Sequence, residues 1–209
     1  GKGRLGRVWK SKSGDGIWMS LIIKPKIEPY KAPFLTLVAG ASVVKALSNL
    51  DVEASIKWPN DIIVHNKKIC GILTELSAEM ERVNYVVIGI GINIKTIDFP
   101  DEIKEKATSL YKEGYKLSRV DIVRQFCIEF EKLYKGYILD GNKQDTLELC
   151  RKYSAIIGKQ VYVIKNNKRE LVKCIDINEN GNLIVKEKNG EIQEIMSGEV
   201  SIRGVKGYV

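Results

Sequence analysis

The pattern of apolar residues changes character near Ile156, and this change constrains the fold more than any other feature of the sequence. Before it, the apolar segments are long. Ile17–Ile23 and Tyr85–Ile94 have the composition of buried strands, and Pro33–Leu50 repeats its apolar residues at helical spacing. After it, the segments are short and separated by turn residues, which indicates about five short strands. The sequence therefore predicts an α+β unit followed by a small all-β unit.

We place the boundary so that residues 1–155 form the first unit and residues 156–209 form a small closed β-barrel. Two Asn-Gly pairs, Asn180-Gly181 and Asn189-Gly190, suit type I′ hairpin turns in the barrel. No low-complexity linker separates the units, so we expect them to abut. In the first unit, the unbroken apolar run of Tyr85–Ile94 predicts a strand that is covered on both faces.

A hairpin and three helices complete the predicted elements. The hairpin pairs Asp61–His65 with Ile69–Leu76 across a turn at Asn66-Lys67. A short helix begins at Pro100, a long helix covers Arg119–Tyr137 with Ser118 as its N-cap, and a further helix reaches about Tyr153.

Charge and cysteine content limit the functional classes. Lys and Arg number 34 against 26 Asp and Glu, and the net charge of +8 favours anionic partners, either nucleic acid or phosphate-bearing small molecules. The only histidine is His65, which argues against a histidine-rich metal site or a Ser-His-Asp triad. The four cysteines form no C-x-x-C pair, so we expect free buried thiols in a reducing cytoplasm. The absence of an apolar run of about 18 residues predicts no membrane span.

The first twelve residues are rich in cations and glycine and contain no acid. Gly1, Gly3 and Gly6 match the dinucleotide pattern G-x-G-x-x-G, but no strand precedes the match and no helix start follows it. The phosphate-loop pattern fails because Arg7 and Val8 follow Gly6. The segment is either a solvated basic loop or one that folds over an anion.

Three further stretches carry polar groups or glycine where strands are expected. Asn60 and Asp61 stand at the mouth of a strand, where they could hold Mg²⁺ or orient a ligand hydroxyl, or simply form an Asx turn. Lys68 opens the returning strand, either as a functional cation or as an exposed turn lysine. Gly89 and Gly91 interrupt an apolar strand, which indicates close packing of either a helix or a planar ring.

Taken together, these stretches resemble the biotin protein ligase family. The resemblance covers nearly the whole chain in the family's order, although Lys2 and Leu5 replace two arginines of its basic loop. The family's catalytic domain normally begins several dozen residues earlier, so the resemblance implies an amino-terminally incomplete catalytic domain. The matching residues are Gly1 to Arg7 with Trp9, Ser11 and Gly14, Lys57 to Asp61, Lys68 with Gly71 to Leu73, Gly89 to Asn93, Ala107 to Leu110, and Gly198 to Arg203.

The resemblance implies a fold and a two-step reaction. The fold is a mixed β-sheet with packed helices, like that of class II aminoacyl-tRNA synthetases, followed by an SH3-like barrel. Biotin and ATP, with Mg²⁺, give biotinyl-5′-AMP and pyrophosphate, and biotin then passes to a lysine of a carboxylase biotin carrier domain. A homodimer is one option, no membrane partner is expected, and DNA is expected only if an amino-terminal DNA-binding domain exists.

The resemblance also assigns roles to residues. The catalytic residues implied are Lys68, Arg4 and Asp61, with Lys68 as the cation that bridges the biotin carboxylate and the α-phosphate. Those implied to bind biotin are Lys2, Gly3, Arg4, Lys68, Gly71, Ile72 and Leu73. Those implied on the ATP side are Arg7, Trp9, Asn60, Gly89, Gly91, Asn93, Arg119 and Arg203, and Asn60 and Asp61 are the candidate metal ligands.

Two alternatives remain at this point. A lipoate ligase shares the fold and the adenylation chemistry, although the basic loop followed by Trp9 favours biotin. A basic nucleic-acid-binding protein would explain the net charge, but it requires exposed aromatic residues across the barrel, where only Tyr153, Tyr162 and Tyr208 are found.

Overall fold

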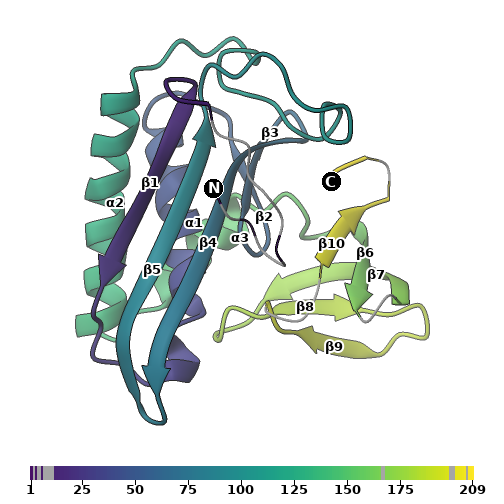
Figure 1. Ribbon diagram of the computed structural model, residues 1–209. Coiled ribbons are helices and arrows are strands. Elements are labelled where there is room, and N and C mark those ends of the chain that lie inside the picture. Colours follow the sequence, from purple (N-terminus) through teal and green to yellow (C-terminus); the bar gives the residue numbers. More distant parts are fainter. Residues whose placement is uncertain (2, 4–5, 7–11, 166–167, 198–200, 206) are drawn as a thin grey trace.

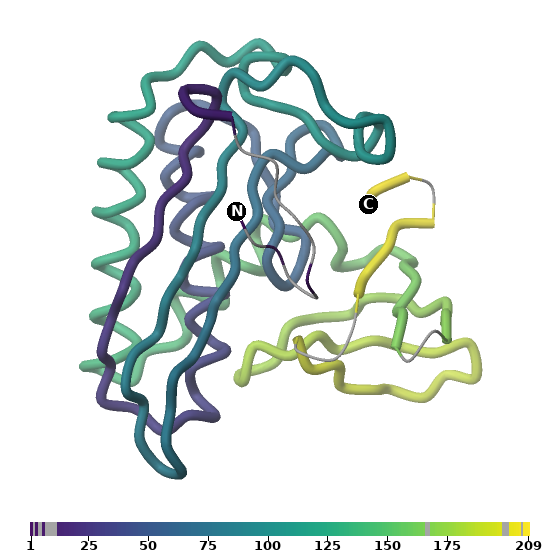
Figure 2. The backbone as a smooth tube through the Cα atoms, in the orientation of Figure 1, coloured from purple at the N-terminus to yellow at the C-terminus, as the bar shows by residue number. Residues whose placement is uncertain are grey.

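The computed structural model describes all 209 residues except 2, 4–5, 7–11, 166–167, 198–200 and 206. It contains two five-stranded antiparallel sheets and three α-helices among the described residues, so the predicted α+β class is confirmed (Figure 1). The first sheet and the helices come from the part of the chain before Ile156. The second sheet comes from the part after it, and Figure 2 shows the chain passing from one to the other once.

The first sheet has the strand order β1-β5-β4-β3-β2. Its named strands all pair antiparallel, and parallel pairing is limited to isolated bridges between Ile56 and Ser154 and between Lys68 and Ala107. The expected mixed sheet is thus antiparallel in all its ladders. Its strands are β1 (Gly16–Ile23), β2 (Ser55–Lys57), β3 (Asp61–Val64), β4 (Lys67–Glu79) and β5 (Arg82–Asn93).

Helix α1 (Phe34–Ser48) follows a short 3₁₀ turn, η2 (Pro29–Lys31), and packs against β2, β3 and β4. It is apolar on nearly every side because α2 (Arg119–Leu139) and α3 (Gln144–Lys152) cover its outer surface. The stretch Pro29–Ser48 has the length and composition of a membrane-spanning helix, contrary to the sequence prediction, but 72% of that window is buried in the fold, as in a core helix. The predicted N-cap is confirmed, since the Ser118 side chain accepts a hydrogen bond from the Val120 amide.

Strand β5 is covered on one face only, which corrects the prediction of two covered faces. Val86, Ile88, Ile90 and Ile92 are buried on the side of the helices, whereas the residues between them are partly exposed. The helices lie on one side of the sheet in Figure 1, and the other face is open. The sequence shows no alternation of apolar and polar residues here, because the positions between the buried residues are glycine and valine and not charged residues.

Several turns differ from the sequence predictions. The hairpin between β3 and β4 turns at His65 and Asn66, with φ of 46° and 62°, one residue before the predicted turn. At the two Asn-Gly pairs only the glycines have positive φ, so the turns there are not type I′. Residues 101–106 form successive turns and not the predicted short helix. Cys127 is exposed, whereas the other three free cysteines are buried as expected.

The second sheet has the order β10-β6-β7-β8-β9. Its five strands confirm the predicted number, and among the described residues β9 and β10 are its two edges. The strands are β6 (Gln160–Lys165), β7 (Lys168–Ile177), β8 (Leu183–Lys186), β9 (Ile192–Ile195) and β10 (Ser201–Gly204).

The two units are in direct contact, as expected from the lack of a linker. The Trp58 indole donates a hydrogen bond to the carbonyl of Gly181, at 3.0 Å, in the turn between β7 and β8. Gly181 has φ of +81°, and a Cβ there would lie 2.4 Å from the Leu37 side chain in α1. Glycine is therefore required at this position both by its backbone conformation and by the close approach of the two units.

Candidate active site

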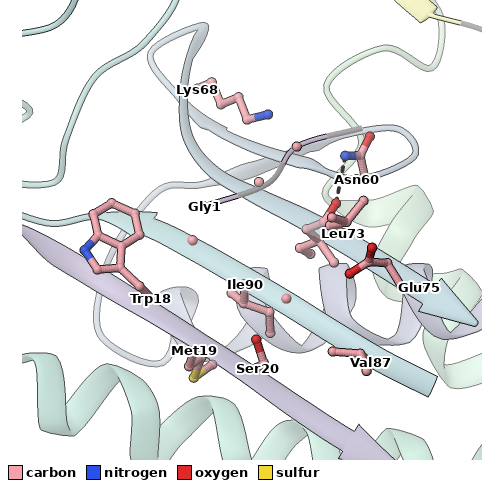
Figure 3. Close-up of a pocket in the computed structure, with 15 residues that line it drawn as sticks. Gly1, Trp18, Met19, Ser20, Asn60, Lys68, Leu73, Glu75, Val87 and Ile90 are labelled. Carbon is pink, nitrogen blue, oxygen red and sulfur yellow. Dashed lines mark hydrogen bonds between the residues drawn. The ribbon is translucent and has the colours of Figure 1, made fainter. Parts of the chain in front are cut away.

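A cavity of about 350 Å³ lies on the open face of the first sheet. Its floor follows from the strand register, since successive side chains of a strand point to opposite faces. Trp18 in β1, Gly91 in β5 and Gly71 in β4 lie opposite one another, and the row ends at Asp61 in β3. The next row consists of Ser20, Gly89 and Leu73. The centre of the floor therefore lacks side chains between the Trp18 ring and the polar groups of β3 and β4 (Figure 3).

The glycines of β5 are explained by this cavity. A Cβ on Gly89 would lie 3.7 Å from the Leu73 carbonyl oxygen, an ordinary contact, so the protein's own packing does not require glycine there. The helices are on the opposite face of the sheet, which excludes close helix packing as the reason. The remaining interpretation from the sequence, close approach of a flat ligand, is the one that fits the structure.

The floor also depends on Gly16, which the sequence analysis did not single out. A Cβ at Gly16 would lie 2.5 Å from the Trp18 ring and 2.5 Å from the Ile92 carbonyl oxygen. Glycine thus allows the indole to lie close to the backbone at the cavity edge. The Trp18 indole nitrogen donates to the carbonyl of Lys12, at 3.2 Å, which connects the ring to the end of the basic segment.

A β-bulge decides the direction of Lys68. Ile62 pairs with Cys70, but Ile63 pairs with Lys68, so Ile69 is an extra residue in β4. In a regular strand without the extra residue, the Lys68 side chain would point to the same face as Cys70, which is the face covered by the helices. The bulge instead turns Lys68 onto the same face as Gly71, where it lines the cavity with its side chain 21% exposed. The interpretation of Lys68 as an ordinary exposed turn lysine is therefore wrong.

Two polar residues accompany Lys68. Its ammonium forms an ion pair with Oδ1 of Asp61, whose side chain is 15% exposed. Asn60 is tied to β4 by two hydrogen bonds with Ile72, one from its side-chain amide and one to its backbone carbonyl, both 2.9 Å. Figure 3 shows the Lys68 ammonium and the Asn60 amide on one side of the cavity and Trp18 on the other. The Asn60 side chain thus fixes the start of β3 to β4.

A second cavity, of about 420 Å³, lies next to the carboxyl end of β5. Asn93 lines it, and its side-chain amide donates to the carbonyl of Thr108 at 3.0 Å. Lys12, Lys95, Asp15 and Asp98 also line it, so the cavity brings two cations and two carboxylates together with an amide. The structure therefore separates Asn93 from Gly89 and Gly91, which the sequence analysis had grouped together.

The segment behind Lys68 is held by an acidic residue. Glu113 accepts hydrogen bonds from the Thr108 hydroxyl, at 2.6 Å, and pairs with His65 in the hairpin turn. Burial alone would raise the pKa of Glu113, but the hydrogen bonds from Thr108 and His65 outweigh it and hold that pKa below its ordinary value. The backbone amide of Lys68 also donates to the carbonyl of Lys106 at 2.8 Å. The hairpin that carries Lys68 is thus fastened to residues 106–113.

The remaining predicted site residues are distributed unevenly. Gly3 lines the first cavity with Gly71, Ile72, Leu73, Gly89 and Gly91, but the Ile72 side chain is buried toward α1, so its contribution there comes from the main chain. Arg119 is exposed at the start of α2, and Arg203 lies in β10; neither lines either cavity. Lys2, Arg4, Arg7 and Trp9 lie outside the described residues.

The predicted site residues do not include Trp18, Met19, Ser20, Glu75, Val87 and Ile90, which also line the first cavity. A signal for them existed in the alternation of β-strands. Val87 is two residues before Gly89, and Glu75 is two residues after Leu73, so each shares a face with a predicted site residue. Trp18 and Ser20 could be placed only once the pairing of β1 with β5 was known.

Comparisons with known proteins agree with this geometry. Residues 1–93 match the biotin/lipoate A/B protein ligase family, and residues 156–203 match the biotin protein ligase C-terminal domain. The chain is 40% identical over 206 residues to the bifunctional ligase/repressor BirA of Bacillus subtilis, covering 97% of this chain and 63% of that protein. It is 33% identical over 119 residues to the biotin–[acetyl-CoA-carboxylase] ligase of Mycobacterium tuberculosis, covering 54% of this chain and 42% of that protein.

A solved structure shows the same fold. The biotin protein ligase of Aquifex aeolicus in complex with biotin and ATP superimposes with a TM-score of 0.83 at 29% identity, over 97% of this chain and 84% of that one. The chain spans about 63% of the length of the BirA relative. Both units of the fold, the order of the motifs and the two matched families therefore lead to one conclusion: the chain belongs to the biotin protein ligase family.

Proposed function

We propose that the protein activates biotin with ATP to form biotinyl-5′-AMP and pyrophosphate, and then transfers biotin to a lysine of a carboxylase carrier domain. The observation that carries this proposal is the position of Lys68. A bulge directs its ammonium into a cavity whose floor is made of glycine backbone. The volume of about 350 Å³ is within the range of small-molecule sites.

Biotin is proposed to lie on the floor of the first cavity. The glycine backbone of β4 and β5 would allow its fused rings to approach the sheet, and Leu73 and Trp18 would supply apolar surface at the edges. The carboxylate of biotin would then point toward Lys68. Gly1 and Gly3 also line this cavity, so these two residues lie beside the proposed ligand.

Lys68 is proposed to make the first step feasible. The biotin carboxylate must attack the α-phosphorus of ATP, and both groups are anionic. A fixed cation between them lowers their repulsion and stabilises the extra charge of the transition state. In the second step, the carrier lysine amine attacks the carbonyl of the mixed anhydride, and AMP leaves. Closure of the basic segment with Arg4 over the adenylate would keep water away from that anhydride.

The second cavity is proposed to receive the nucleotide. It lies at the carboxyl end of β5, and its lining combines Lys12 and Lys95 with the amide of Asn93 and the carboxylates of Asp15 and Asp98. Because Asn93 itself is bound to the carbonyl of Thr108, the amide also fixes one wall of this cavity. Arg119 and Arg203, the other proposed nucleotide contacts, lie outside both cavities and would have to move or contact only the outer part of ATP.

Mg²⁺ is proposed to bind mainly through the phosphates of ATP. No group of three acidic, histidine or cysteine side chains suited to a metal exists in the described part of the chain. Asn60 and Asp61 stay the candidate protein ligands, since they stand together at the start of β3, and the Asp61 carboxylate also pairs with Lys68 and Tyr208. A magnesium ion that bridges substrate phosphates usually takes only one or two protein ligands, and it neutralises phosphate charge.

The remaining parts of the proposal concern partners and organisation. We propose that residues 1–155 form the catalytic unit and residues 156–209 a small SH3-like β-barrel domain that contributes to carrier binding. The carrier domain of acetyl-CoA carboxylase is the proposed acceptor, by analogy with the name of the mycobacterial relative. We propose a cytoplasmic location, which suits four free cysteines, and a homodimer remains an option. Neither lipoate ligation nor nucleic-acid binding gains support, since the relatives reported above are all named as ligases of biotin or as BirA.

The proposal is tested by incubating the full-length protein with a biotin carrier domain, ATP, Mg²⁺ and either biotin or lipoate. Mass spectrometry should find one biotin added to the carrier lysine, and only when ATP is present. A carrier domain with arginine at the acceptor position is the control for nonspecific labelling. Labelling by lipoate and not by biotin would overturn the proposal.

A further inference from the structure

The segment that follows β10 returns to the catalytic unit and reaches the partner of Lys68. Tyr208 donates a hydrogen bond from its hydroxyl to Oδ2 of Asp61, 147 positions earlier in the sequence. The other oxygen of the same carboxylate pairs with Lys68. Figure 1 shows the end of the described chain beside β10, on the side that faces the first sheet.

Tyr208 is itself held by a buried lysine. Lys57 is only 2% exposed as a residue. Its ammonium donates to the Tyr208 carbonyl at 2.6 Å and lies 3.3 Å from the centre of the Tyr208 ring. A buried ammonium is costly unless it is hydrogen-bonded. A carbonyl and an aromatic face together provide such an environment. Lys57 thus fixes both the backbone and the ring of Tyr208, and thereby the direction of its hydroxyl.

The backbone between β10 and Tyr208 is adapted to this return. Gly207 has φ of +88°, which favours glycine. A Cβ at Gly204 would lie 2.3 to 2.8 Å from the backbone of Val209, so only glycine allows the chain to fold back at this point. The contact of Tyr208 with Asp61 is therefore part of a turn whose sequence supports it.

We propose that Tyr208 is a positioning residue for the adenylation step, acting on Lys68 through Asp61. This inference rests on the proposed role of Lys68. By donating to one carboxylate oxygen, the phenol fixes the orientation of Asp61 and takes up part of its charge. The other oxygen then holds Lys68 at the cavity. Because part of the carboxylate charge is taken up by the phenol, the Lys68 ammonium can still contact the biotin carboxylate and the α-phosphate.

The test uses Tyr208→Phe in the full-length protein, since this change removes the hydroxyl and keeps the ring that contacts Lys57. The maximal rate of biotin-dependent ATP–pyrophosphate exchange should fall about tenfold, which is the lower range for loss of a hydrogen bond to a charged group. The KM for biotin should change by less than about twofold, since the lost interaction orients a group that acts mainly in the transition state. Tyr162→Phe, in β6 of the same sheet, is the matched control and should behave like the wild-type protein.

A double-mutant cycle separates positioning from a structural role. In an Asp61→Ala background, Tyr208→Phe should cause no further loss of exchange rate, because the carboxylate through which it acts is absent. A full tenfold loss in that background, or a wild-type rate for the single variant, would overturn the inference. If Tyr208→Phe is silent while Lys68→Ala is inactive, only this inference fails. If Lys68→Ala is itself fully active, the proposed function of the site fails as well.

Discussion

Replacing Lys68 with alanine tests the centre of the proposed mechanism. At an effective dielectric constant near 20, an ammonium about 4 Å from an anion contributes roughly 4 kcal/mol. Water replaces part of this interaction in the variant. Removing one preorganised donor from an anionic transition state typically costs about a hundredfold to a thousandfold in rate. We therefore expect adenylation by Lys68→Ala to be at least about a hundredfold slower, equivalent to about 2.7 kcal/mol.

The effect on folding should be small by comparison. Lys68 and Asp61 are 21% and 15% exposed, so their ion pair is only partly buried, and Asp61 keeps its hydrogen bond from Tyr208 in the variant. A pair of this kind is worth about 1 kcal/mol or less. For a chain of this length, the melting temperature should fall by about 2 to 4 °C at most. The structure thus predicts a large loss of rate with a minor loss of stability.

The assay is biotin-dependent ATP–pyrophosphate exchange, measured together with thermal melts. Lys67→Ala is the matched control, because Lys67 precedes Lys68 in β4 and does not line the cavity. It should be nearly silent in both measurements. Equal exchange rates for the two variants would refute the role of Lys68. A melting temperature far below that of Lys67→Ala would show that the lost activity reflects folding and not chemistry.

Three further predictions concern the cavity floor, the contact between the units and the acidic residue behind the hairpin. Gly89→Val should leave the melting temperature nearly unchanged, since a Cβ there makes only ordinary contacts with Leu73, but it should weaken biotin binding at least about tenfold by filling the floor, as measured by calorimetry. Gly181→Ala should lower the free energy of unfolding by about 1–3 kcal/mol in urea titrations, because of its positive φ and the contact with Leu37, and Gly141→Ala, where φ is also positive but the space is open, should cost less. The lowered pKa of Glu113 should stabilise the fold above the ordinary glutamate pKa of about 4.3, and this contribution should disappear as the pH falls through the lower pKa of the folded state. The difference in unfolding free energy between the wild-type protein and Glu113→Gln should therefore narrow on acidification, and a constant difference between pH 7 and 3.5 would contradict this.

Local sequence patterns were sufficient for most elements of the fold. The long apolar strands before Ile156, the long helix capped by Ser118 and the five short strands after Ile156 were predicted, because periodicity and capping depend on residues close together in the sequence. The short strand β2 was not predicted, and the predicted helix at Pro100 is absent. The glycines of β5 were also recognised as exceptional. Their reason was left open between a helix and a ligand, since a single strand does not show which face of a sheet is covered.

The tertiary structure alone decided how the site is assembled. The bulge at Ile69 turns Lys68 toward the cavity, and it depends on the register between two strands and not on either strand's own sequence. The separation of Asn93 from Gly89 likewise follows from where the second cavity opens. The contact of Tyr208 with Asp61 joins residues 147 positions apart, and no local pattern marks it. The sequence determined which residue types were available at short range, whereas the pairing of strands and the packing of one unit on the other determined which of them meet, since such contacts form only when distant parts of the chain come together.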